Sequence, residues 1–141
     1  MPAAKQEAES LTTELLPFAQ QLLRRHGEFY PYGGLLHADG SVVHVGAEDP
    51  DAPTPDAASM TETLRRRLRE GVEQSGARAA AIVCWARVTP PGGAHPSDAI
   101  EVLVQHREGY CANVFFPCQL KGGRLTFGQV FAQTCGKQIL G

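Results

Sequence analysis

Apolar residues at helical spacing mark the first element of the chain. They form a stripe that would lie on one face of a helix: Leu11, Leu15, Phe18 and Leu22. We expect this helix to begin near Thr13, because Pro17 then lies in the first turn, where its missing N–H matters least. Residues 1–9 are polar and are expected to be frayed. Gly27 follows a basic run and is a natural left-handed stop for the helix.

An Asp-Gly pair between two apolar runs comes next. The pair Asp39-Gly40 predicts a β-hairpin, because glycine tolerates a positive φ at no steric cost. The strands of this hairpin can pair in either of two registers. With a two-residue turn, His37 and His44 lie on one face, within reach of a shared ligand. With a three-residue loop, His44 opposes Gly34 and the two histidines face opposite sides.

A proline-rich acidic segment separates this hairpin from a second helical pattern. Residues 47–58 contain three prolines and four acids, which predicts a mobile surface loop. Ser59 and Glu62 have the spacing of a capping box and predict the start of a helix that ends near Ser75, before Gly76. Its buried stripe would contain Met60, Leu64, Leu68 and Val72.

The rest of the chain has the patterns of β-strands. Residues 78–88 are apolar at both alternations through the centre of the run, which is typical of a central strand covered on both faces. Residues 99–107 and 110–117 alternate between apolar and polar positions, and a last alternating run follows at 125–131. Because short turns join the last three strands, we expect them to form an antiparallel meander.

These elements predict one α+β domain over residues 1–141, a length that suits a single buried core. The sheet is expected to be a single antiparallel sheet of about five strands, in the order αββαβββ. Both helices are expected to pack on one face of it.

Charge and hydropathy exclude several classes of protein. The net charge of −2 gives no general attraction to nucleic acid, and the arginines of the second helix are interpreted as a solvated face paired with glutamates. No run of 18 apolar residues exists, so we expect no membrane span. The N-terminal residues lack the apolar core of a secretory signal, and we expect a cytoplasmic location.

The four cysteines show no C-x-x-C pair. We expect all of them to be reduced and to act as small hydrophobes in a reducing cytosol. Their spacing with the histidines fits no standard zinc pattern, so neither a metal nor a cofactor is expected. The cysteines are Cys84, Cys111, Cys118 and Cys135.

No catalytic motif is present, and we assign no catalytic residue. His95, Glu101 and His106 are weak polar candidates. Catalytic pairing of His106 with Glu101, or of a cysteine with His95, stays open, although His106 is better interpreted as a hydrogen-bonded histidine at the edge of the core.

The aromatic corner before the hairpin is the best candidate for contact with a ligand or partner. Phe29, Tyr30 and Tyr32 combine apolar area with hydroxyl groups, a combination enriched at interfaces. With His37 and His44 they form the candidate interface or pocket. The alternative is that these rings plug the end of the helix–sheet core.

Four segments resemble a group of small uncharacterised bacterial proteins, over most of the chain: 26–33, the 39–40 hairpin, 88–92 and 98–102. That resemblance implies no activity. The order αββαβββ is also loosely similar to the roadblock/LC7 fold, whose members dimerise and regulate GTPases or motors. Roadblock proteins usually end in a further helix, and residues 133–141 are too short for one.

We therefore expect a non-enzymatic protein-interaction or regulatory module, with a protein partner or self-association. The alternative is a small enzyme or ligand-binding protein that uses a histidine-lined cleft.

Overall fold

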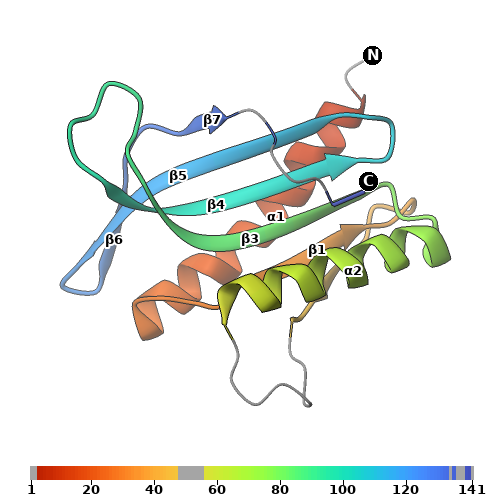
Figure 1. The fold of residues 1–141 in the computed structure, drawn as a ribbon, viewed down its shortest axis with the longest axis horizontal. Helices are drawn as coiled ribbons and strands as arrows, with labels where there is room; N and C mark the ends of the chain where they lie inside the picture. Colours follow the sequence, from red (N-terminus) through yellow and green to blue (C-terminus); the bar gives the residue numbers. More distant parts are fainter. Residues whose placement is uncertain (1–2, 48–55, 134, 136–138, 141) are drawn as a thin grey trace.

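The computed structural model describes residues 3–47, 56–133, 135 and 139–140. It has the α+β class, with two helices and one antiparallel sheet (Figure 1). The helices are α1 (Ala3–His26) and α2 (Ala57–Ser75). The strands are β1 (Tyr32–Leu36), β2 (Val42–Val45), β3 (Ala79–Val88), β4 (Ser97–His106), β5 (Cys111–Lys121), β6 (Arg124–Phe127) and β7 (Phe131–Gln133).

The sheet has seven strands in the spatial order β2-β1-β3-β4-β5-β6, and β7 pairs with β5. The predicted order αββαβββ, with about five strands, is therefore wrong. The chain forms five strands after α2, where the order αββαβββ has three. The strand-like runs at 78–88, 99–107, 110–117 and 125–131 already number four, and the last of them divides into two strands that pair with different parts of β5. Strand β6 pairs with Cys118–Lys121, and β7 pairs with Asn113–Phe115.

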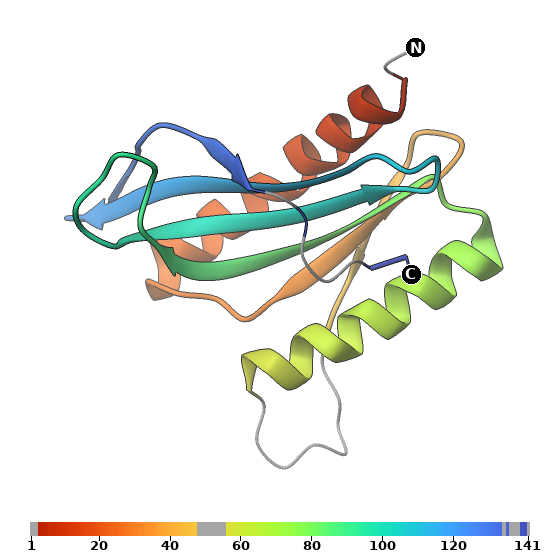
Figure 2. The ribbon, with the colours of Figure 1, turned by 45° about the horizontal axis from the view of Figure 1, so that its top comes forward.

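The two helices cover opposite faces of the sheet, so the prediction that both pack on one face is wrong (Figure 2). Alternate residues of β3 belong to separate clusters. Ala79, Ala81 and Val83 pack with α1, and Ala80 and Ile82 pack with α2. The prediction that this strand is covered on both faces is confirmed.

Helix α1 begins at Ala3, so the predicted start near Thr13 is wrong. Residues 3–9, expected to be frayed, form its first turns. Burial of the early apolar positions explains the difference, because Ala8 and Leu11 are fully buried against the sheet. Pro17 consequently lies inside the helix, where it removes one backbone hydrogen bond.

Two glycines let both helices approach β1. A Cβ at Gly33 would lie 2.8 Å from the carbonyl oxygen of Ala81 and 3.0 Å from Cδ1 of Leu68, on the α2 side. A Cβ at Gly34 would lie 2.6 Å from Cδ2 of Leu15, on the α1 side. Because neither glycine has a side chain, Leu68 of α2 and Leu15 of α1 can pack closely against opposite faces of β1.

The hairpin adopts the three-residue loop. Gly34 pairs with His44 and Leu36 with Val42, and the N–H of His37 donates to the Ser41 carbonyl at 2.9 Å. Because the side-chain period of a strand is two, His37 and His44 face opposite sides. The structure therefore excludes a site shared by these two histidines.

Helix α2 ends where expected, but its cap differs. Asp56, not Ser59, is the N-cap, and its side chain accepts a hydrogen bond from the Ser59 N–H at 2.9 Å. The predicted capping box is therefore wrong. Gly76 has a φ of 70° and ends the helix as expected. The predicted mobile loop 47–58 lies mostly outside the described residues.

Cys111 and Cys135 form a disulfide, so the expectation of four reduced cysteines is wrong. Beside this link, Ile139 is fully buried in the cluster under α2. The side-chain oxygen of Gln105 accepts hydrogen bonds from the N–H groups of Ile139 and Leu140, at 2.9 and 2.8 Å. Ile139 and Leu140 thus cover part of the sheet face on which α2 packs.

Candidate functional site: the aromatic pocket

A pocket of about 930 Å³ lies where α1 ends, β1 begins, β2 ends and α2 begins. We call it the aromatic pocket. Its lining is mainly apolar, with few polar groups, as is typical of small-molecule sites. The lining residues are Phe18, Leu22, His26, Glu28, Phe29, Tyr30, Pro31, Tyr32, His44, Val45, Gly46, Ala47 and Met60.

Tyr32 anchors the wall of the pocket. It is the first residue of β1, and its ring is nearly buried against α1. Its hydroxyl donates to the backbone carbonyl of Leu15 at 2.5 Å. Burial raises the pKa of this phenol well above its usual value, so the hydroxyl stays protonated as a donor. The ring is therefore held in one orientation by the helix that it packs against.

Other rings pack around Tyr32 at two orientations. The ring planes of Tyr32 and His44 are nearly parallel, with centroids 6.1 Å apart. Phe18 stands almost perpendicular to both, at 82° to Tyr32 and 90° to His44. The centroid of the Phe29 ring lies 5.9 Å from that of Tyr32 and 6.0 Å from that of Trp85. The rings thus supply walls that meet at a steep angle.

Tyr30 and Phe18 are the accessible rings of the aromatic pocket. Their exposed fractions are 61% and 41%, which are high for large apolar side chains. Glu28, His26 and His44 are also exposed. Among the described lining residues of the pocket, Glu28 is the acidic one.

The structure brings together four of the five predicted interface or pocket residues. Phe29, Tyr30, Tyr32 and His44 all line the aromatic pocket. His37 does not, because the hairpin register turns it to the other side. Sequence reasoning missed Phe18, Leu22 and His26, although their spacing of four along α1 is the signal that could have placed them beside the aromatic corner.

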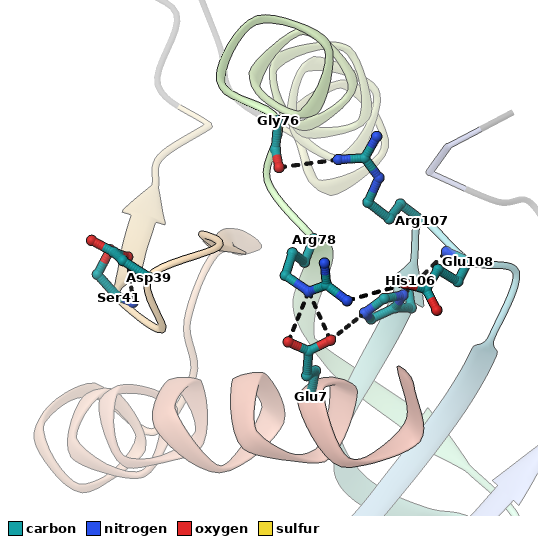
Figure 3. A network of polar contacts seen from close by, with 8 residues as sticks. All are labelled: Glu7, Asp39, Ser41, Gly76, Arg78, His106, Arg107 and Glu108. Carbon is teal, nitrogen blue, oxygen red and sulfur yellow. Dashed lines mark hydrogen bonds and ion pairs between the residues drawn. The ribbon is translucent and has the colours of Figure 1, made fainter. Parts of the chain in front are cut away.

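His106 belongs to a separate polar network under α1 (Figure 3). It is 1% exposed, and its Nδ1 accepts the backbone N–H of Glu108 at 3.1 Å. The proton therefore resides on Nε2, which donates to Oε1 of Glu7 at 2.8 Å. Arg78 also donates to Glu7, at 2.8 Å. The interpretation of His106 as a hydrogen-bonded core-edge histidine is confirmed.

We expect the stability of the fold to fall at acid pH, as the carboxylate of Glu7 becomes protonated. The hydrogen bond from His106, followed by that from Arg78, lowers the pKa of Glu7 below its usual value of 4.5. A carboxylate with a lowered folded-state pKa stabilises the fold above its unfolded-state pKa, and this contribution is lost as pH falls through the folded-state value. We expect Glu7→Ala to lower the free energy of unfolding by about 1–3 kcal/mol at pH 7, because the buried Nε2–H of His106 loses its acceptor.

The measurement is urea unfolding from pH 7 to pH 3, with Glu9→Ala as the control because Glu9 is exposed. The Glu7 variant should lose less stability than the parent protein on acidification below pH 4.5. Equal acid losses in both proteins would refute the role of Glu7.

The remaining polar candidates are not brought together. Glu101 pairs with Cys84 across β3 and β4, on the face of α2, whereas His106 faces α1. His95 lies exposed in the loop before β4. Burial, and then the charge of Glu101, raises the pKa of the Cys84 thiol to about 11, which disfavours its use as a nucleophile.

Within residues 3–47, 56–133, 135 and 139–140, no three histidine, cysteine or acidic side chains gather as metal ligands would. In the same described part of the chain, no helix is long and apolar enough to cross a membrane.

Comparisons with known proteins do not assign this chain to a family. The chain matches no protein-family model, no curated protein and no solved structure. Function must therefore be argued from the geometry of the site.

Proposed function

We propose that this chain is a non-enzymatic binding module that holds a mainly apolar small molecule in the aromatic pocket. The main observation behind the proposal is the cavity of about 930 Å³, whose lining includes several aromatic side chains. Small-molecule sites typically have volumes of about 300–1,000 Å³ and a mainly apolar lining with a few polar groups.

The packing of the rings supports binding rather than core filling alone. Tyr32 and Phe29 pack against the core, as the alternative interpretation of the aromatic corner requires. Tyr30 and Phe18 remain accessible beside them. The aromatic corner therefore combines an ordered floor with exposed rings, and a preformed site reduces the entropy lost on binding.

The separation of the polar candidates supports a non-enzymatic function. A general base and its partner act within hydrogen-bonding distance of each other, and Glu101 and His106 lie on opposite faces of β4. A protein partner, self-association and a regulatory role stay predictions.

The proposal predicts that a neutral, environment-sensitive dye such as prodan binds with enhanced, blue-shifted fluorescence. Replacing both accessible rings, in the variant Phe18→Ala/Tyr30→Ala, should weaken the affinity about tenfold, the effect expected of central aromatic contacts. Fluorescence titration measures both affinities.

Phe127→Ala is the matched control, because Phe127 is 44% exposed but lies in β6, outside the lining of the pocket. Its affinity for the dye should equal that of the parent protein. The proposal is wrong if the parent protein does not bind the dye, or if the control variant loses as much affinity as the double variant.

A further inference from the structure

We propose that the ligand of the aromatic pocket is an organic cation, an ammonium group attached to an apolar body. This inference rests on the proposed function and adds the charge of the ligand. It follows from two features of the lining: the ring walls and the sign of the charge among them.

The ring walls suit a cation. The faces of aromatic rings carry partial negative charge, and a cation within about 6 Å of a ring centroid is attracted to it. Phe18 stands at 82° to Tyr32 and 90° to His44, so the rings are arranged as two walls rather than one flat stack. Tyr30, the most exposed of the phenylalanine and tyrosine rings in the lining, adds a further aromatic surface.

The charged groups favour the same sign of ligand. Among the described residues that line the aromatic pocket, Glu28 is the acidic one, and none is a lysine or an arginine. Arg67 binds the backbone of this wall, because its Nη1 donates to the carbonyl of Gly46 at 2.8 Å. Attraction to the Glu28 carboxylate and to the ring faces would each favour an ammonium group, whereas both would oppose an anion.

Three of the polar lining residues come from one short stretch of the chain, whereas His44 comes from β2. His26, Glu28 and Tyr30 are neighbours at the end of α1 and in the segment that follows it. Leu22, Val45 and Met60 supply the apolar part. A ligand with one charged end and an apolar body matches this division.

Three probes that share a benzyl group test the sign of the charge: benzyltrimethylammonium, benzyl alcohol and benzylsulfonate. We expect the cation to bind at least fivefold more tightly than the alcohol or the sulfonate, by isothermal titration calorimetry or NMR titration. Glu28→Gln should reduce the cation's affinity at least threefold and leave that of the alcohol unchanged. Tyr30→Leu should also weaken the cation selectively, because it keeps the apolar area but removes the ring.

Glu14→Gln is the control variant, because Glu14 is exposed on α1 and does not line the pocket. It should bind all three probes as the parent protein does. If the alcohol binds as tightly as the cation, or if Glu28→Gln leaves the cation's affinity unchanged, the charge inference is wrong and the proposed function stands. If none of the probes binds and prodan does not bind either, both are wrong.

Discussion

Replacing Leu15 by alanine is expected to lower the free energy of unfolding by about 2–5 kcal/mol, the usual range for a fully buried leucine. Leu15 is 0% exposed in the cluster between α1 and the sheet. Its side chain fills the space beside Gly34, and its carbonyl accepts the hydroxyl of Tyr32. The truncation leaves a cavity under the strand that carries the aromatic pocket.

Urea unfolding followed by the fluorescence of the single tryptophan, Trp85, measures this loss. Leu16→Ala is the matched control, because Leu16 is only half-buried beside the same cluster. It should lose less than half as much stability. Similar losses for the two variants would contradict the packing of α1 described above.

Loss of the Cys111–Cys135 disulfide is expected to lower the free energy of unfolding by about 3 kcal/mol, because the bond restricts the unfolded chain. The two cysteines are 24 residues apart in sequence. Cys135→Ser should show this loss, and the parent protein treated with dithiothreitol should fall to the same stability. Thermal unfolding with and without the reductant measures it.

Cys84→Ser is the control, because Cys84 is a free thiol. This variant should keep the sensitivity to reductant of the parent protein. A parent protein that is equally stable with and without dithiothreitol would show that the disulfide does not contribute to the fold.

The sequence predicted those elements that are marked by a few residues adjacent in the chain. The stop at Gly27, the end of α2 at Gly76 and the Asp39-Gly40 turn depend on backbone conformations that glycine favours. Strand β3 was predicted from its own alternation, because burial on both faces requires apolar residues at every position. The aromatic corner was identified because tyrosine and phenylalanine stand next to one another in the chain.

Contacts between distant segments decided the rest. Helix α1 extends back to Ala3 because Ala8, Leu11 and Glu7 find partners on strands far along the chain, which outweighs the poor local signal before Thr13. The division of the run 125–131 depends on where β5 offers free backbone groups. The disulfide depends on a return of the C-terminal segment to Cys111, which the spacing of cysteines does not encode.

The aromatic pocket, too, was predicted from the sequence only in part. The sequence by itself determined that aromatic residues precede the hairpin, and that His44 shares a face with either His37 or Gly34. Only the tertiary structure decided that the hairpin loop has three residues, which separates His37 from His44. It also brought Phe18 and Met60 to the same cavity from two helices. The physical reason is that a pocket is formed by surfaces that meet in space, and the free energy of that meeting comes from burial of residues distant in the chain.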